Sequence, residues 1–205
     1  MDKLQHIFIE GKDQNEPTLL LLHGTGGNER DLLPIAEMIA PTASILGVRG
    51  NVLENGMPRF FRRISEGVFD EEDLVFRTEE LNQFIEDAAD KYKFDRNRVL
   101  AIGYSNGANI AASLMYHYKH ALNGAVLLHA MVPRRGVEVP DLTNTPVFIG
   151  AGVNDPLIPQ AETKELAEVL RNANAHVTEH WGQAGHQLTR EEIMEAKTWY
   201  EQNYK

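Results

Sequence analysis

The sequence contains no cysteine among its 205 residues. Disulfide bonds, a cysteine nucleophile and thiolate metal sites are therefore all excluded. The absence of cysteine fits a reducing compartment, so we expect a cytoplasmic protein. The longest apolar run, at residues 19–22, is far too short to span a bilayer, and the first residues lack the basic and apolar regions of a secretory signal. We expect no membrane partner.

Basic residues are also scarce, because 20 Lys and Arg stand against 30 Asp and Glu and leave a formal net charge of −10. This balance argues against a nucleic-acid partner, since phosphates are bound by clustered Lys and Arg. The sequence has no H-E-x-x-H motif and no comparable histidine pair beside a carboxylate, so we expect neither a metal nor another cofactor. The length and the 42% hydrophobic residues suit one domain spanning residues 1–205.

Short apolar runs alternate with longer amphipathic stretches along the chain. This alternation predicts an α/β fold, with a mostly parallel sheet covered by helices on both faces. No insertion between the last expected strands is long enough for a large lid domain. Functional residues of such sheets lie beyond the carboxyl ends of the strands. The expected strands are 7–9, 18–22, 44–48, 99–103, 125–128, 147–149 and 175–181, and the expected helices are 71–92, 106–118, 159–172 and 189–200.

The sequence also predicts how the last helix begins and which segment lacks regular structure. The order Thr189-Arg190-Glu191-Glu192 predicts a capping box at the start of the last helix. Residues 49–70 form the longest stretch without clear regular structure, and we expect this segment to cover part of the site.

A nucleophile elbow is predicted at residues 103–107, which read G-Y-S-N-G after an apolar strand and before a helix of small residues. The serine of a G-x-S-x-G motif lies on a sharp turn, and the flanking glycines avoid collisions with the neighbouring strand and helix. Ser105 is therefore the candidate nucleophile. A structural turn with an incidental serine is the alternative.

A glycine-rich loop follows the strand at 18–22 and reads H-G-T-G-G at residues 23–27. Loops of this type supply one backbone N–H to an oxyanion hole, and the second N–H comes from the residue after the nucleophile. We assign these donors to Thr25, with Gly26 as the alternative, and to Asn106. A phosphate-binding loop is disfavoured, because the G-x-x-x-x-G-K-[ST] spacing is absent.

The acid and the base are expected after the serine, in that order. Asp155 follows the strand at 147–149, with Asp141 in reserve, although Asn-Asp-Pro is also common turn chemistry. His186 lies between the last strand and the last helix, from where its imidazole can reach Ser105. A carboxylate at Asp155 would orient that imidazole and stabilise its protonated form.

Together these segments resemble the bacterial phospholipase/carboxylesterase family of α/β-hydrolases, whose relatives include the acyl-protein thioesterases. The resemblance covers nearly the whole chain and rests on residues 23–27, 103–107, 154–159 and 185–186. More narrowly, the chain is similar to small hydrolases of Gram-positive bacteria associated with quinone and hydroquinone stress. The resemblance implies hydrolysis of small carboxylic esters by Ser105, Asp155 and His186, and it leaves a homodimer open.

The segment 48–61 is similar to the substrate-side loop of that family. Phe69 and either Arg62 or Arg63 could also face the site. Two departures from the thioesterases, Asn106 in place of their usual Gln and a polar loop at 129–135, disfavour a long acyl chain. The candidate substrate contacts are His23, Gly24, Met57, Arg59, Phe60, Phe61 and His129.

The sequence therefore predicts a serine carboxylesterase with a small-molecule ester substrate. A thioesterase, lactonase or acyl-protein hydrolase of the same fold is the alternative. A binding module without catalysis is a third interpretation, disfavoured by the intact triad. One fold hosts many functions, so the choice depends on the site.

Overall fold

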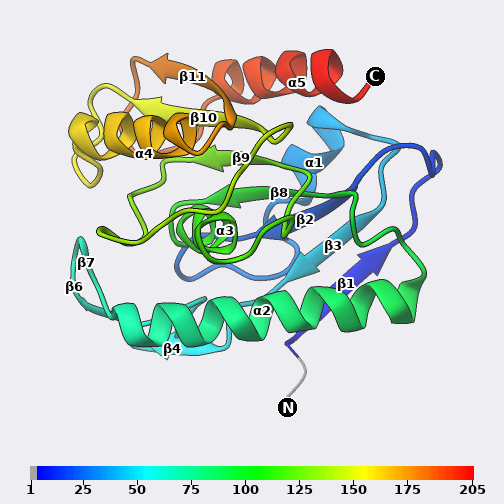
Figure 1. The fold of residues 1–205 in the computed structure, drawn as a ribbon, viewed down its shortest axis with the longest axis horizontal. Coiled ribbons are helices and arrows are strands. Elements are labelled where there is room, and N and C mark those ends of the chain that lie inside the picture. Colours follow the sequence, from blue (N-terminus) through cyan, green and yellow to red (C-terminus); the bar gives the residue numbers. More distant parts are fainter. Residues whose placement is uncertain (1–3) are drawn as a thin grey trace.

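The computed structural model describes residues 4–205 and contains one seven-stranded sheet flanked by helices (Figure 1). The strand order is β1-β3-β2-β8-β9-β10-β11. Every neighbouring pair is parallel except β1 with β3. The strands are β1 (His6–Ile9), β2 (Thr18–Leu22), β3 (Ile45–Val48), β8 (Val99–Tyr104), β9 (Gly124–Leu128), β10 (Pro146–Gly152) and β11 (His176–Gly182).

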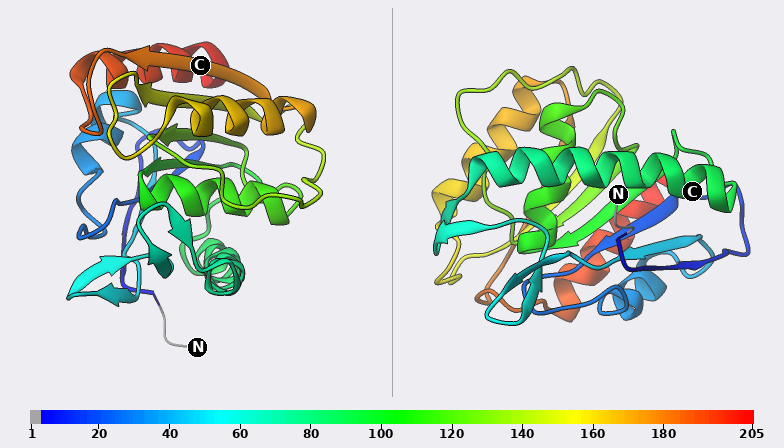
Figure 2. Two further views of the ribbon diagram at one scale, coloured as in Figure 1. Left: turned by 90° about the vertical axis from the view of Figure 1, so that its left-hand side faces the viewer. Right: turned by 90° about the horizontal axis from the view of Figure 1, so that it is seen from below.

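Five helices cover both faces of this sheet, with α2, α3 and α4 on one side and α1 and α5 on the other (Figures 1 and 2). The helices are α1 (Leu33–Ile39), α2 (Glu71–Tyr92), α3 (Asn106–His117), α4 (Gln160–Asn172) and α5 (Arg190–Tyr204). This arrangement confirms the expected α/β-hydrolase type of fold. Within residues 4–205 no inserted lid domain is present, and no helix is both long and apolar enough to cross a membrane.

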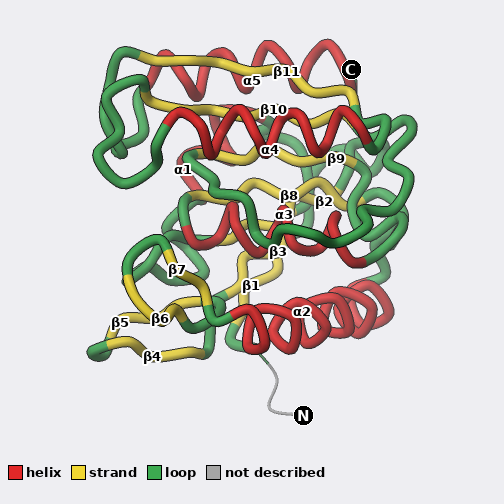
Figure 3. The backbone as a smooth tube through the Cα atoms, turned by 60° about the vertical axis from the view of Figure 1, so that its left-hand side comes forward, coloured by secondary structure: helices red, strands yellow, loops and turns green. Residues whose placement is uncertain are grey.

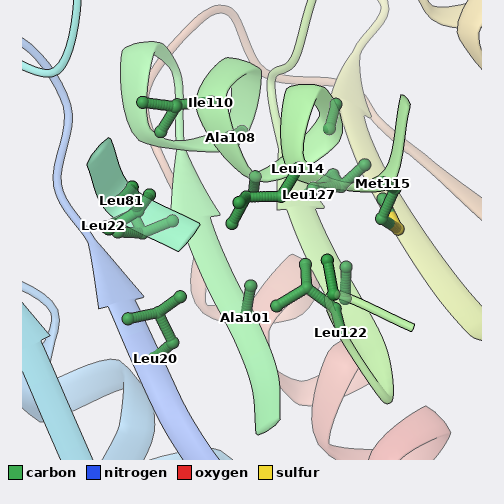
Figure 4. Close-up of a cluster of buried hydrophobic side chains, with 14 of the residues drawn as sticks. Leu20, Leu22, Leu81, Ala101, Ala108, Ile110, Leu114, Met115, Leu122 and Leu127 are labelled. Carbon is green, nitrogen blue, oxygen red and sulfur yellow. The ribbon is translucent and has the colours of Figure 1, made fainter. Parts of the chain in front are cut away.

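The central strands are buried on both faces because their successive side chains enter opposite cores. In β2, Leu20 and Leu22 belong to the core beneath α2, α3 and α4, whereas Leu19 and Leu21 belong to the core beneath α1 and α5. Figure 4 shows the first of these cores, where Leu20, Leu22, Ala101 and Leu127 from three strands meet apolar side chains of α3.

Two parts of the chain have regular structure that was not expected from the sequence. The first is α1, which has seven residues, a proline near its start and no side-chain cap. Such a short helix carries too few periodic positions to be distinguished from a loop.

The second part is residues 49–70. These residues were expected to be irregular, but they form two small antiparallel hairpins. The hairpins are β4 (Val52–Glu54) with β5 (Met57–Arg59) and β6 (Arg63–Ser65) with β7 (Val68–Phe69). Both lie outside the main sheet, beside the start of α2 (Figure 3). Strands of two or three residues are too short to show an alternating pattern.

The parallel strands end at one edge of the sheet. Leu22 of β2 pairs with Gly103 of β8, Tyr104 of β8 pairs with Leu128 of β9, and Leu128 pairs with Gly150 of β10. The loops that follow these strands therefore emerge side by side, as expected for a site at the carboxyl ends of parallel strands.

Candidate active site

Ser105 lies in the turn that joins β8 to α3, with φ at 52° and ψ at −114°. This backbone conformation is strained for a residue with a side chain. Two glycines make the turn possible: a Cβ at Gly103 would lie 2.7 Å from Cα of Ala108, and one at Gly107 would overlap the carbonyl of Leu22. The amide of Ser105 donates a hydrogen bond of 2.9 Å to the carbonyl of Leu128, which fixes the turn against β9.

His186 and Asp155 complete a hydrogen-bonded series with this serine. Nε2 of His186 lies 3.0 Å from Oγ of Ser105, and Nδ1 of His186 lies 2.8 Å from Oδ2 of Asp155. With the proton on Nδ1, the ring donates to the carboxylate and accepts from the hydroxyl. The hydroxyl of Tyr104 donates to the carbonyl of His186 across 2.8 Å and holds the loop in place.

The side chain of Asp155 is 1% exposed. Burial acts to raise the pKa of this carboxyl, but hydrogen bonds from His129, His186 and the amides of Leu157 and Ile158 together hold it below its ordinary value. Asp155 is therefore ionised at neutral pH, the state needed to orient His186 and to stabilise its imidazolium. Asp141, the reserve candidate, instead binds Thr143 and Asn174 near the opposite end of the sheet.

A second histidine shares this carboxylate. Nδ1 of His129 lies 2.9 Å from Oδ2 of Asp155, and Nε2 of His129 is hydrogen-bonded to Oε2 of Glu192 at 3.3 Å. The sequence indicated His129 only as a contact for substrate, and it indicated Glu192 only as part of a capping box. Thr189 does cap α5, since its hydroxyl accepts from the amide of Glu192 at 3.2 Å, but the Glu192 carboxylate binds His129 instead.

Among the described residues, the amide of Thr25 in the glycine-rich loop after β2 makes no backbone hydrogen bond. The amide of Gly26 donates to the carbonyl of Pro58 at 2.9 Å, which removes the alternative donor and favours Thr25. Asn106 is the first residue of α3, so its amide has no acceptor within the helix. Both residues line the same cavity as Ser105, as an oxyanion hole requires.

This cavity has a volume of about 350 Å³. It is bounded by Ser105, His186 and the glycine-rich loop on the sheet side, and by the hairpin residues on the other. Its lining residues are Gly24, Thr25, Arg59, Arg63, Glu66, Gly67, Phe69, Tyr104, Ser105, Asn106, Asn109, Met131, Leu157, Ile158 and His186.

Only two of the seven expected substrate contacts, Gly24 and Arg59, line this cavity. Phe60 and Phe61 are buried in the core at 3% and 0% exposure, because the chain turns inward after β5. Met57 is exposed beside Gly26, outside the cavity lining.

The two histidines among the seven are also buried, at 1% for His23 and 2% for His129. Nδ1 of His23 donates to the carbonyl of Gly24 at 2.6 Å, and its Nε2 accepts from the amide of Gly50 at 3.0 Å. Burial lowers the pKa of His23, which favours this neutral form. His23 therefore holds the loop, and neither histidine is available to contact substrate.

Three side chains of the site, His129, Asp155 and His186, could in principle ligate a metal, since their donor atoms lie within 4.8 Å of one another. Hydrogen bonds account for this spacing, because both Nδ1 atoms approach the same Asp155 oxygen. An ion coordinated through either Nδ1 would displace one of these hydrogen bonds.

Comparison with known proteins identifies the family. The family model described as Phospholipase/Carboxylesterase matches residues 4–203. The chain belongs to the phospholipase/carboxylesterase family. It is 57% identical over 199 residues to MhqD of Bacillus subtilis (strain 168), whose name calls it a hydrolase, with 97% of this chain and 98% of MhqD covered.

A solved carboxylesterase structure and a more distant thioesterase sequence are also similar to this chain. The Bacillus cereus carboxylesterase superposes with a TM-score of 0.98 at 62% identity, over 99% of this chain and 96% of that one. The acyl-protein thioesterase 1 of Cryptococcus neoformans is more distant, at 26% identity over 174 residues, 76% of this chain and 73% of the thioesterase. Membership of this family makes the protein a hydrolase of the carboxylesterase type.

Proposed function

We propose that this protein is a serine carboxylesterase that hydrolyses small carboxylic esters through an acyl-enzyme intermediate. Ser105 is the nucleophile, His186 the general base and Asp155 the residue that orients the base. The observation that carries this proposal is the pair of contacts at His186, 3.0 Å to Oγ of Ser105 and 2.8 Å to Oδ2 of Asp155. Family membership supports the same chemistry.

The reaction proceeds in two acyl-transfer steps. His186 takes the hydroxyl proton as Oγ of Ser105 attacks the ester carbonyl, and the imidazolium then protonates the leaving alcohol. In the second step His186 removes a proton from water, which attacks the acyl-enzyme and releases the carboxylic acid and free Ser105. The amides of Thr25 and Asn106 would stabilise each oxyanion by about 3 kcal/mol per donor. This chain alone supplies all of these groups, so the proposed cycle needs no cofactor.

The cavity supports a small substrate. A volume of about 350 Å³ lies near the lower end for sites that hold small molecules. Phe69, Met131, Leu157 and Ile158 supply apolar surface, whereas the buried guanidinium of Arg59 supplies a polar wall. We therefore propose short acyl groups as substrates, with polar substituents tolerated near Arg59.

A thioester substrate is the second candidate, supported by the similarity to acyl-protein thioesterase 1. The same nucleophile, base and oxyanion donors would serve a thioester. Matched oxygen esters and thioesters of acetate, butyrate and octanoate separate the two candidates: a higher kcat/KM for the oxygen esters at short chain length supports the esterase.

The proposal is tested with Ser105→Ala and a chromogenic short-chain ester. Loss of one triad member costs orders of magnitude in kcat, so we expect a fall of at least a thousandfold. Ser65→Ala, a change at an exposed serine on a hairpin, serves as the control and should retain the parent rate. A fluorophosphonate should label the peptide that contains Ser105 and no other. Equal rates for Ser105→Ala and the parent would refute the proposal.

A further inference from the structure

Both ring nitrogens of His129 face carboxylates. Oδ2 of Asp155 is hydrogen-bonded to Nδ1 at 2.9 Å, and Oε2 of Glu192 is hydrogen-bonded to Nε2 at 3.3 Å, with Oε1 of Glu192 3.1 Å from the same nitrogen. The side chains of all three residues are at most 4% exposed, so both contacts are buried. An imidazole donates from both nitrogens only when it is protonated. The geometry therefore matches an imidazolium held between two carboxylates.

The direction of the pKa shift of His129 agrees with this geometry. Burial acts to lower the pKa of His129, but the hydrogen bonds and negative charges of Glu192 and Asp155 outweigh it and raise the pKa above its ordinary value. Other titratable groups face the ring as well. Tyr104 at the end of β8 and His186 lie with ring centroids 6.0 and 5.3 Å from that of His129. On β11, His180 occupies the register position beside Gly150.

The backbone around His129 and Glu192 leaves room for their contact. His129 has φ at 56°, a conformation uncommon for residues with a side chain, and its amide donates to the carbonyl of Gly150 at 2.8 Å. A Cβ at Gly150 would overlap Oε1 of Glu192, so the absence of a side chain there leaves room for the carboxylate. The Thr189 cap fixes the start of α5 from which Glu192 extends.

We propose that His129 and Glu192 are positioning residues that set the charge Asp155 presents to His186. This inference rests on the proposed function. Oδ2 of Asp155 accepts from both imidazoles, so the His129 imidazolium neutralises part of the negative charge that would otherwise stabilise protonated His186. The imidazolium that forms on His186 during the reaction consequently faces less negative charge at Asp155 than it would without His129. Glu192 keeps His129 charged.

The test compares His129→Asn and Glu192→Gln with the parent protein. Asparagine tolerates the positive φ at position 129. Two control variants match these changes: His120→Asn alters an exposed histidine with φ at 61°, and Glu191→Gln alters the exposed neighbour of Glu192. The readout is kcat/KM for a neutral ester between pH 5 and 9, together with kcat and KM at the plateau.

We expect the acid limb of kcat/KM to move to higher pH by roughly 0.5–1 pH unit in both His129→Asn and Glu192→Gln. KM at the plateau should stay within about twofold and kcat should fall by up to about tenfold, since the nucleophile and base remain. Both controls should overlay the parent. An acid limb that does not move in either variant overturns the proposal, even if kcat falls, because a purely structural role would lower the rate without moving the limb.

A second measurement covers the case in which the variants do not fold. Nitrogen-15 NMR of the unaltered protein at pH 7 reports directly whether His129 carries protons on both nitrogens, and a singly protonated ring overturns the proposal. The activity of Ser105→Ala separates failure of the proposed function from failure of the proposed role of His129. A fully active Ser105→Ala refutes the proposed function and, with it, the role of His129. If Ser105→Ala is inactive but the acid limb does not move in His129→Asn and Glu192→Gln, only the role of His129 is refuted.

Discussion

The backbone amide of Phe60 donates a hydrogen bond of 2.7 Å to Oδ1 of Asn106. Phe60 belongs to the segment 49–70, and Asn106 follows the proposed nucleophile. The same segment contacts the glycine-rich loop, through the carbonyl of Pro58 with the amide of Gly26 and through Arg59 with Thr25. The hairpin segment is thus attached to both proposed oxyanion donors, so its position and theirs depend on one another.

Asn106→Ala should therefore loosen the hairpin segment as well as the oxyanion hole. The change leaves the buried amide of Phe60 without an acceptor, which costs about 1–3 kcal/mol in the free energy of unfolding. We expect a lower urea midpoint and faster proteolysis within residues 49–70. Ser65→Ala, at an exposed residue of the same segment, is the control. Unchanged proteolysis in Asn106→Ala would show that the segment is held by its other contacts.

Arg59→Gln tests what the buried guanidinium does for the substrate. Arg59 is 3% exposed, donates to Oγ1 of Thr25 at 2.7 Å and lines the cavity, with Glu54 at 3.5 Å. Loss of its charge should reduce kcat/KM for an ester bearing a carboxylate by about tenfold more than for a neutral ester of equal length. Paired assays on butyrate and hemisuccinate aryl esters give the ratio.

Arg62→Gln is the control for Arg59→Gln, since the Arg62 side chain is 64% exposed and lies outside the cavity lining. If Arg59→Gln lowers both rates by the same factor, Arg59 acts only by supporting the Thr25 loop.

The raised pKa of His129 predicts a pH-dependent contribution to stability. A group whose pKa is higher in the folded state stabilises the fold fully below its unfolded value, about 6.5 for histidine, and loses that effect as pH rises through the folded value. The difference in unfolding free energy between the parent and His129→Asn should therefore be largest near pH 6 and shrink toward pH 9. Urea unfolding at four pH values measures it, and a difference that grows with pH would contradict the assigned direction.

Local chemistry explains which parts of the site could be predicted from sequence. The turn around Ser105 needs small residues at positions 103 and 107, so its signature is contiguous, and Asp155 and His186 each follow a recognisable strand. Glu192 could not be found in this way. Its partner His129 is distant in the chain, and the adjacent Thr189 gives Glu192 a complete local explanation as a capping residue. Likewise, Phe60 and Phe61 directly follow Arg59, which lines the cavity, but both are buried in the core. Sequence could not reveal this, because the direction of these side chains depends on the folded hairpins.

The packing between Gly150 and Glu192 links two positions that no local pattern connects. Any side chain at position 150 would occupy the space that the acid at position 192 fills. Within this backbone, an alanine at 150 would force the Glu192 carboxylate to shift from its place beside His129. A single methyl group on β10 would thus alter how α5 meets the histidine behind the proposed nucleophile.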